Sequence, residues 1–339
     1  MSMEAITRPI EDSRTYKMPA GMRLGPPTLR VRNLARALSF YRQDLGLRIR
    51  HGRPDPKHEL TGQLGFPKQI VELGSHDPGY NYSTSSLVNI LHDPDAKPDQ
   101  HGSAGLYHYA MLVSDRKSLA ITYLAIVKTG LVYEGFADHT ASESLYLLDG
   151  ENNGIEIYAD RPRDTWAPFM ELMKRGGSSD IQAFVSLNKP LDLDSLLEEL
   201  SPEERNRPEP FPRGVRIGHI HLRATNLEQS VKFYHEKLGL DIIGNLPGIG
   251  AAFLSVGGYH HHIGMNTWHS ENGKRHEQGE AGLESFTIYL PDRPSIDVLA
   301  RHLGSSIKTR DLDRLTVLDP DGIEILVRAE NPNPTAVSG

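Results

Sequence analysis

Apolar and polar residues alternate along several short segments of the chain. In HIHLRA (219–224) and FTIYL (286–290), every second residue is apolar. Side chains of a strand point alternately to its two faces, so this period of two predicts strands with one buried face. Segments with apolar residues at helical spacing lie between such strands, and together the two patterns indicate a fold that mixes sheets and helices.

One strand-and-helix pattern occurs twice. RVRNLARALSFYRQDLGLRI (30–49) recurs as RATNLEQSVKFYHEKLGLDI (223–242), with the Asn-Leu, Phe-Tyr and Leu-Gly-Leu groups in the same register. Each copy is typical of a strand, then an amphipathic helix that begins after a capping Asn and ends at a Gly. Chance does not explain so many identities in one register, so we infer a duplication.

A second pair of segments extends the repeat. GLYHYAMLVSD (105–115) aligns without gaps to GLESFTIYLPD (282–292), and LYLLDGENNGIEIY (145–158) parallels LTVLDPDGIEIL (315–326). Each half of the chain therefore contains two strand–helix–strands units in tandem, and the whole chain contains four. The class expected from this arrangement is α+β.

The length of 339 residues predicts two domains. The segment after the first half breaks the repeat with an acidic helix and a Pro-rich charged linker, and we interpret it as a connector without a catalytic role. The predicted division is a tail (1–20), an N-terminal domain (21–160), the connector (161–213), a C-terminal domain (214–330) and a second tail (331–339). The first tail has the character of an arm onto another subunit, which favours a homo-oligomer.

Composition narrows the class of protein. The chain has 38% hydrophobic and 24% charged residues, which is ordinary for a globular protein, and no apolar run approaches the length of a membrane span. Its beginning lacks an apolar signal core, so we expect a cytoplasmic protein without a membrane partner. A net charge of −7 with interspersed signs argues against a nucleic-acid partner.

The chain has no cysteine, so thiolate ligands and disulfides are excluded. A metal would have to bind histidine, carboxylate or carbonyl groups, which favours Fe(II), Mn(II) or Zn(II). Two histidine-rich segments could supply imidazoles. His219 and His221 share one face of a predicted strand, and in YHHHIGMN the same alternation places His260 and His262 on one face and His261 on the other.

A carboxylate in the last predicted strand completes a candidate site. Glu324 of DGIEILV lies between Ile323 and Ile325, and burying it among apolar residues is costly without a cation or a donor. Two histidines and one carboxylate from three strands would form the facial triad of non-haem Fe(II) oxygen chemistry. Each residue also has a structural explanation, such as a pair between Glu324 and Arg223. Their recurrence at equivalent positions of the repeat favours a shared site.

GHIHL, NLEQSVKFYHEKLGL and DPDGIEI resemble the vicinal oxygen chelate superfamily of glyoxalase I, bleomycin-resistance proteins and type I extradiol dioxygenases. The whole arrangement, from about residue 21 to residue 328, is most similar to bacterial catechol 2,3-dioxygenases. This resemblance implies four β-α-β-β-β modules that form two tandem vicinal-oxygen-chelate domains with cup-shaped mixed sheets. The metal would lie inside a cup, with ligands from the first and last strands of each module.

In the C-terminal half the resemblance implies ligand positions at His219, His262, Ser285 and Glu324. Many extradiol enzymes have a second metal histidine where this chain has Ser285, so the expected ligands are His219, His262 and Glu324. The acid/base role then passes to His260 or His221. These enzymes often present a tyrosine from the strand before the glutamate, and RLTVLD (314–319) has none.

In the N-terminal half the matching positions are Pro26, a residue within 87–93, His108 and Glu156. Pro26 has no side-chain ligand atom. We therefore predict a degenerate, structural copy, in which His108 and Glu156 form a buried polar pair.

The predicted function is extradiol cleavage of a small aromatic diol by O2, with Fe(II) or alternatively Mn(II) as template and Lewis acid. A neutral His260 or His221 would accept a phenolic proton. The expected substrate wall consists of Tyr289, Arg223, Asn266 and Trp268. Two alternatives keep the same fold: a glyoxalase-like isomerase or lyase with Zn(II) or Ni(II) and four protein ligands, and a metal-free small-molecule-binding protein.

Overall fold

The computed structural model describes residues 15–51, 70–75, 86–100, 102–175, 181–206 and 214–331. Most of the first predicted tail (1–14) and nearly all of the second (332–339) lie outside the described residues. The rest of the first tail packs onto the fold, because Tyr16 and Met18 are buried and the Met18 amide donates to the Gly239 carbonyl at 3.0 Å.

The four predicted modules are present, and each has its helix between its first and second strands. The first has β1 (Arg23–Val31), α1 (Leu34–Leu38), η1 (Ser39–Asp44), β2 (Arg48–His51), β3 (Ile70–Gly74) and β4 (Ser86–His92). The second has β5 (Gly105–Leu112), α2 (Arg116–Thr129), β6 (Gly135–Asp138), β7 (Ser142–Leu148) and β8 (Gly154–Asp160).

The second half repeats this order. The third module has β9 (Arg216–Arg223), α7 (Leu227–Lys232), η4 (Phe233–Lys237), β10 (Asp241–Leu246), η5 (Pro247–Ile249), β11 (Ala251–Ser255) and β12 (Ile263–Asn266). The fourth has β13 (Gly282–Asp292), α8 (Arg293–Leu303), η6 (Gly304–Ser306), β14 (Ile307–Arg310), β15 (Arg314–Leu318) and β16 (Glu324–Asn331).

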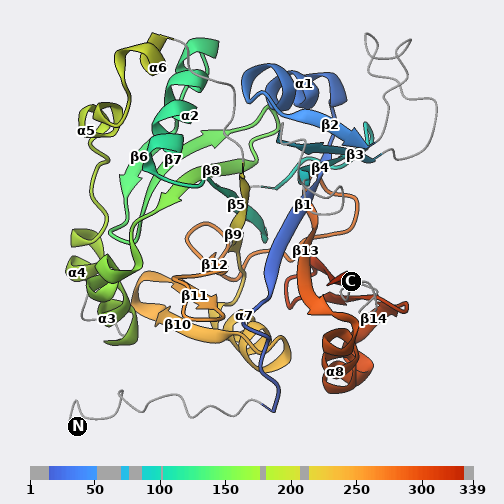
Figure 1. The fold of residues 1–339 in the computed structure, drawn as a ribbon. Helices are drawn as coiled ribbons and strands as arrows, with labels where there is room; N and C mark the ends of the chain where they lie inside the picture. The colour runs from blue at the N-terminus through green and yellow to red at the C-terminus, as the bar shows by residue number, and fades with distance from the viewer. Residues whose placement is uncertain are drawn as a thin grey trace, which may run out of the picture.

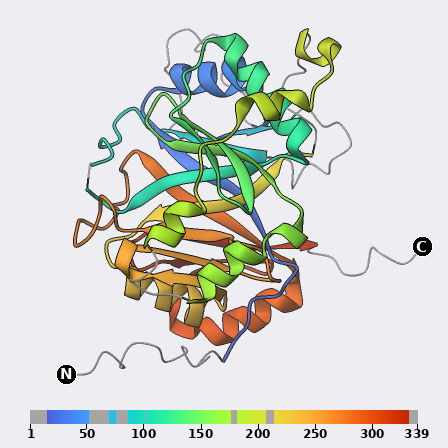
Figure 2. The same ribbon diagram turned by 90° about the vertical axis from the view of Figure 1, so that its left-hand side faces the viewer.

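The strands form two eight-stranded mixed sheets with the same internal order, β14-β15-β16-β13-β1-β4-β3-β2 and β10-β11-β12-β9-β5-β8-β7-β6. The α+β fold with tandem vicinal-oxygen-chelate modules is thereby confirmed. At the centre of each sheet, the first strands of two modules pair antiparallel, β1 with β13 and β5 with β9. Helices α1 and α2 lie at one end of the molecule and α7 and α8 at the other, with the strands between them (Figures 1 and 2).

Each sheet draws one module from each half of the chain. The first module pairs with the fourth, and the second pairs with the third. The sequence predicted one cup from residues 21–160 and another from 214–330, but the observed strand pairing interleaves the two halves. The repeat could not specify this, because all four modules present a similar first strand and any two of them could pair along it.

Tyrosines of the repeat connect the two sheets. The Tyr41 hydroxyl donates to Asp149 Oδ2 at 2.8 Å, and the Tyr234 hydroxyl donates to Asp319 Oδ2 at 3.0 Å. Each bond joins the two modules of one half, which lie in different sheets. The repeated Phe-Tyr and Leu-Asp motifs therefore hold each half together, while strand pairing holds the halves to one another.

The predicted helix signals are also confirmed. Asn33 Oδ1 accepts the Arg36 amide at 2.9 Å, and Asn226 Oδ1 accepts the Gln229 amide at 3.0 Å. These caps satisfy amides that have no partner inside a helix. Both helices then widen into a π-helical turn, η1 or η4, before the chain reverses.

The connector forms η2 (Arg163–Thr165), α3 (Ala167–Arg175), α4 (Ile181–Ser186), α5 (Leu193–Glu198) and α6 (Pro202–Asn206). Figure 2 shows α3 and α4, in yellow-green, lying across the strands. Trp166 and Phe169 pack with Phe253 and Tyr259 in one apolar cluster, so the connector covers part of the second sheet. Within the described ranges, no helix has the length and apolar character needed to cross a membrane.

Candidate metal centre

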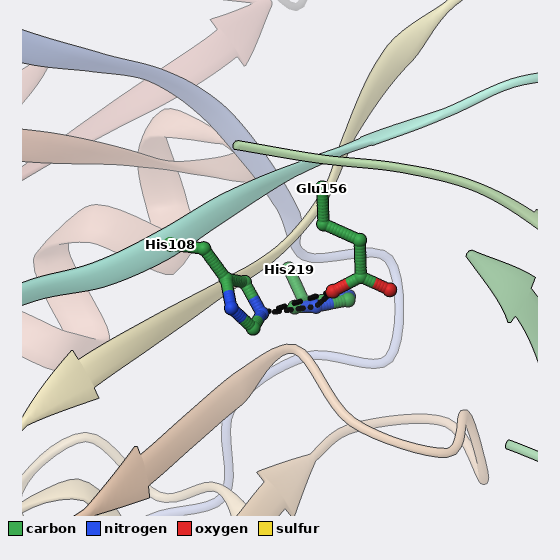
Figure 3. A group of neighbouring side chains, drawn as sticks. All are labelled: His108, Glu156 and His219. Carbon is green, nitrogen blue, oxygen red and sulfur yellow. Dashed lines mark hydrogen bonds and ion pairs between the residues drawn. The ribbon is translucent and has the colours of Figure 1, made fainter. Parts of the chain in front are cut away.

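Three buried side chains from three strands converge on one point of the second sheet (Figure 3). His108 on β5 and His219 on β9 each place Nε2 2.9 Å from Glu156 Oε2 on β8. The two Nε2 atoms lie 3.2 Å apart. In the part of the chain that the structure describes, this is the one set of three His, Cys, Asp or Glu side chains whose ligand atoms lie close enough to share a metal.

Strand register explains the convergence. Ala110 of the central strand β5 lies opposite His219 on one side and opposite Glu156 on the other. His108 is two residues from Ala110, so its side chain emerges on the same face. The methyl group of Ala110 is too short to separate its neighbours, and the longer side chains of His219 and Glu156 meet above it beside His108.

Glu156 is held by contacts that leave one oxygen for the imidazoles. The Ser144 hydroxyl donates to Oε1 at 2.6 Å, while Oε2 faces the two histidines. Burial raises the pKa of this carboxyl, but His219 and His108 outweigh burial and hold the pKa well below its usual value. The group is therefore a carboxylate at neutral pH. Ser144 orients it through Oε1, in the way that hydrogen-bond partners outside the ligand set commonly orient metal ligands.

The histidines nearby are kept neutral. Burial lowers the pKa of His219 to about 4, against the opposing effect of Glu156. Burial also lowers the pKa values of His221 and His261 well below the ordinary value, and neighbouring histidines add to the effect. Metal binding requires neutral imidazole, so this environment suits a ligand. Two imidazole nitrogens and one carboxylate oxygen match the donor set of non-haem Fe(II) oxygenases.

A cavity of about 580 Å³ opens beside the three ligands. His108, Glu156 and His219 all line it, as do His221 and His261. Much of the remaining wall is apolar or aromatic. Its members include Tyr107, Tyr146, Phe169, Phe184, Phe253 and Trp268. A concave, largely apolar site with a few convergent polar groups is typical of small-molecule binding.

A chain of hydrogen bonds runs from the cavity to a partly exposed carboxylate. His261 Nδ1 lies 2.8 Å from His260 Nδ1, and His260 Nε2 lies 2.9 Å from Asp160 Oδ1. The side chain of His260 is 1% exposed and that of Asp160 is 25% exposed. The Tyr259 hydroxyl also donates to Asp160 Oδ1, at 3.1 Å. His260, which is itself bound to Asp160, therefore fixes the orientation of the His261 ring.

A second chain reaches the cavity from the connector. The Tyr146 hydroxyl lies 2.6 Å from His139 Nε2, and His139 Nδ1 is hydrogen-bonded to Asn188 Oδ1. Asn188 belongs to the connector, which was interpreted from the sequence as having no catalytic role. The connector is therefore a wall of the cavity, because Phe169, Phe184 and Asn188 all line it.

The predicted ligands His219, His262 and Glu324 are not brought together. Glu324 lies on β16 of the other sheet, paired in register with Ser285, and its carboxylate binds Lys308. His262 uses Nδ1 at 2.7 Å from the Ser255 hydroxyl, and burial lowers its pKa to about 3. The prediction assumed that the third and fourth modules share one cup, whereas the strands place them in separate sheets.

The other predicted site residues divide in the same way. His260, His221 and Trp268 line the cavity, while Asn266 supports it by a bond of 3.0 Å from its Nδ2 to His221 Nε2. Arg223 and Tyr289 are not among the described residues that line it. Arg223 makes two contacts with the Asp99 carboxylate, at 2.6 and 2.9 Å. Tyr289 lies on β13 in the other sheet, opposite Arg23.

Several residues of the site were not predicted from the sequence, although signals for them were present. His108 aligns with Ser285, the position at which a metal histidine was sought, and it was interpreted as part of a polar pair. Tyr146, in the strand before Glu156, aligns with Thr316 of RLTVLD, the segment in which a tyrosine was sought. His261 was assigned to the opposite face by strand alternation, but β12 begins only at Ile263, so that rule did not apply.

Comparison with known proteins shows the family to which the chain belongs. A model of the glyoxalase/bleomycin resistance protein/dioxygenase superfamily matches residues 216–327. A catechol-2,3-dioxygenase of Bacillus subtilis (strain 168) is 35% identical over 300 residues, which are 88% of this chain and 93% of that protein. The chain therefore belongs to the glyoxalase/bleomycin resistance protein/dioxygenase superfamily, also called the vicinal oxygen chelate superfamily.

Two solved structures have the same fold. A candidate dioxygenase from Bacillus subtilis subsp. subtilis str. 168 has a TM-score of 0.58 and 13% sequence identity, over 94% of this chain and 87% of that one. Glyoxalase I from Zea mays has a TM-score of 0.51 and 15% identity, over 91% of this chain and 92% of that one.

Proposed function

We propose that this protein is an extradiol dioxygenase, which cleaves the ring of a catecholic substrate with O2 and a divalent non-haem metal. Fe(II) is the metal that we propose, with Mn(II) as the alternative. The observation that carries the proposal is the convergence of His108, Glu156 and His219 at the wall of a cavity. The relative named catechol-2,3-dioxygenase supports the choice of substrate class.

The proposed ligand atoms are Nε2 of His108, Nε2 of His219 and Oε2 of Glu156. When bound there, a divalent metal supplies a Lewis acid and a template for the diol and dioxygen. Ser144 keeps the other carboxylate oxygen occupied, so Glu156 would offer a single ligand atom. The side chains around the metal site would bind the ring of the substrate, exclude water and transfer protons.

His261 is the proposed base for a phenolic proton. The Asp160 carboxylate can only accept, so His260 donates to it through Nε2–H and has a lone pair on Nδ1. His261 then donates its own Nδ1–H to His260, which leaves its Nε2 free to accept a proton. The sequence had suggested His260 or His221 for this role. In this scheme His260 positions the base, and His221 is engaged by Asn266.

Tyr146 and His139 are the proposed acid on the other side of the cavity. Asn188 Oδ1 accepts from His139 Nδ1–H, so His139 Nε2 accepts the Tyr146 proton. Burial raises the pKa of Tyr146 well above its ordinary value, and the Glu156 charge raises it further. The phenol therefore keeps its proton at neutral pH. When its O–H turns from His139 toward an oxygen of the substrate, it can donate that proton there.

A glyoxalase-like isomerase or lyase is the alternative within the same fold. That chemistry was expected to use four protein ligands, and only three ligand side chains converge among the described residues. A metal-free binding protein is the third candidate, and it leaves the buried pairing of Glu156 with two imidazoles without a role. The dioxygenase therefore remains our conclusion.

The test is metal analysis of protein purified without oxygen, followed by a catechol assay for the yellow ring-cleavage product. Iron or manganese near one equivalent per chain, with yellow product, supports the proposal. Zinc or nickel without ring cleavage would favour the isomerase or lyase. Failure to bind any metal, even after reconstitution, would overturn both and favour a binding protein.

A cytoplasmic location and a homo-oligomer stay predictions. Cell fractionation would check the first, and light scattering would check the second.

A further inference from the structure

The connector contributes two of the three side chains of an aromatic wall of the cavity, which we define as Phe169, Phe184 and Phe253. Phe169 and Phe253 are buried in one apolar cluster, against which Phe184 packs, and all three side chains line the cavity. Phe169 and Phe184 belong to residues 161–213, which have no counterpart in the repeat, whereas Phe253 lies on β11 of the third module. The connector therefore adds two aromatic side chains to the cup formed by the modules.

The cavity is larger than one catechol ring needs. Its volume of about 580 Å³ lies within the range of drug-sized ligand pockets, roughly 300–1,000 Å³, and a single six-membered ring with two hydroxyls fills only part of it. Aromatic side chains border the space on a further side, where Tyr107 meets Trp268 edge-to-face with ring centroids 5.4 Å apart. The remaining room suits an apolar or aromatic group, which gains free energy when it leaves water.

No described Lys or Arg lines the cavity, so apart from a bound metal the described wall has no cationic side chain of either type. Two arginines of neighbouring segments are bound elsewhere, Arg161 by Asp138 and Glu143, and Arg223 by Asp99. Apart from the ligand Glu156, the acidic residue that does line the cavity is Glu134. Because the two hydroxyls of a catechol would occupy the metal, a carboxylate elsewhere on the substrate would lose its water without gaining a cation, and it would meet the like charge of Glu134.

We propose that this pocket selects catechols that carry a bulky, uncharged apolar or aromatic substituent and rejects catechols that carry a carboxylate. The aromatic wall is the part of the chain that makes this selection. The inference rests on the proposed catechol chemistry, but it concerns the pocket wall and can be measured through binding as well as through turnover.

The decisive comparison uses two ligands that differ only in a negative charge and one methyl group, 3,4-dihydroxyphenylacetate and its methyl ester. Binding to the metal-loaded enzyme is followed without oxygen by tryptophan fluorescence, since Trp268 lines the cavity. We expect the ester to bind about tenfold or more tightly than the acid, because an unpaired charge is costly to bury. In air, kcat/KM should show the same preference.

A second comparison tests the apolar group. For 3-phenylcatechol, KM should lie about tenfold or more below that of catechol, because burying an additional apolar group in the pocket stabilises the complex.

Substitutions locate the selectivity. Phe184→Arg should raise the relative affinity for the acid over the ester, because it supplies the missing cation. Phe184→Ala should weaken binding of 3-phenylcatechol more than that of catechol. Val185→Ala is the matched control, since Val185 follows on the same helix, is 61% exposed and does not line the cavity; its selectivity should equal that of the wild type.

The outcomes separate this proposal from the proposed function. Cleavage of catechol with equal binding of acid and ester would overturn the selectivity and leave the dioxygenase standing. Preferential binding of the ester without any ring cleavage would uphold the pocket proposal and overturn the reaction. A Phe184→Arg variant that folds, binds metal and keeps the wild-type preference would show that the aromatic wall does not make the selection.

Discussion

His108 Nε2 and His219 Nε2 lie 3.2 Å apart, on strands contributed by two different modules, and both contact the same oxygen of Glu156. Without a cation this contact is poorly satisfied. If both nitrogens carry protons, two donors face each other, and if one does not, it loses its bond to the carboxylate. A metal ion bound there would resolve the conflict, because it would accept a lone pair from each nitrogen and from the oxygen.

Replacing Glu156 by Gln is expected to abolish metal retention. The amide keeps the size of the side chain but removes the charge that two neutral imidazoles cannot supply. Metal per chain after dialysis, measured by elemental analysis, should fall to the background of the method. Circular dichroism should remain that of the wild type.

Glu324→Gln is the matched control, since Glu324 occupies the equivalent strand of the other sheet and binds Lys308. It should retain full metal content. The opposite pattern, with metal lost from Glu324→Gln and kept by Glu156→Gln, would restore the ligand set suggested by the sequence and refute the one described above.

Tyr146→Phe should lower kcat for ring cleavage by about 10²-fold, the lower end of what a positioned acid or base contributes. The phenyl ring preserves packing, so metal content and the KM for catechol should stay within about threefold, as expected when only a transition-state interaction is lost. Steady-state kinetics with the metal-loaded variant measure both. Unchanged kcat would exclude the Tyr146–His139 pair from proton transfer.

Asp160→Asn should also lower kcat more than it raises KM. A neutral amide accepts more weakly from His260 Nε2–H and can donate to it instead, which reverses the proton positions along the chain to His261. We expect a loss of about 10-fold to 10²-fold, less than for a residue that touches the substrate.

Asp160→Glu, which restores a carboxylate, should recover part of the lost kcat. If the Asn and Glu variants were equally impaired, the role of Asp160 would be packing rather than placement of protons.

The repeat predicted the modules, the Asn33 and Asn226 caps and the α+β class, because these depend on local pattern and on capping chemistry. It could not predict which modules share a sheet, since that choice depends on contacts between similar first strands. The ligand set depended on this choice. Once β5 pairs with β9, His219 faces His108 and Glu156, and Glu324 is left in the other sheet.

The connector was beyond sequence reasoning for a different reason. Phe169, Phe184 and Asn188 lie outside the repeat, so no equivalent segment suggested their place. Their position in the cavity wall follows from packing of α3 and α4 against the sheet, which depends on apolar contacts distant in sequence. Local pattern predicted an acidic helix in the connector, but not which part of the sheet the connector covers.

The Asp319 carboxyl should make stability depend on pH. Burial raises its pKa to about 7, and the nearby Asp321 charge adds to the shift. In the unfolded chain the group ionises near its ordinary value, so between about pH 4 and pH 7 the folded protein holds a proton that the unfolded chain has released. The free energy of unfolding should therefore fall as pH rises through this window, by at most about 1.4 kcal/mol per pH unit from this residue.

Asp319→Asn tests this contribution, because the amide oxygen can still accept the amides of Asp321 and Ile323, and its NH2 can donate to the Tyr234 hydroxyl. Urea unfolding at about pH 5 and about pH 7.5 should show a smaller decline for the variant than for the wild type. Asp292→Asn is the control: the Asp292 cap bonds to Ser295 and has a lowered pKa, so it stays ionised in both states across the window. Its effect should be the same at both pH values.

The contradicting outcome is an equal decline in the free energy of unfolding for the wild type and Asp319→Asn. It would mean that Asp319 is already ionised in the folded protein, with the backbone amides and Tyr234 stabilising the charge against burial.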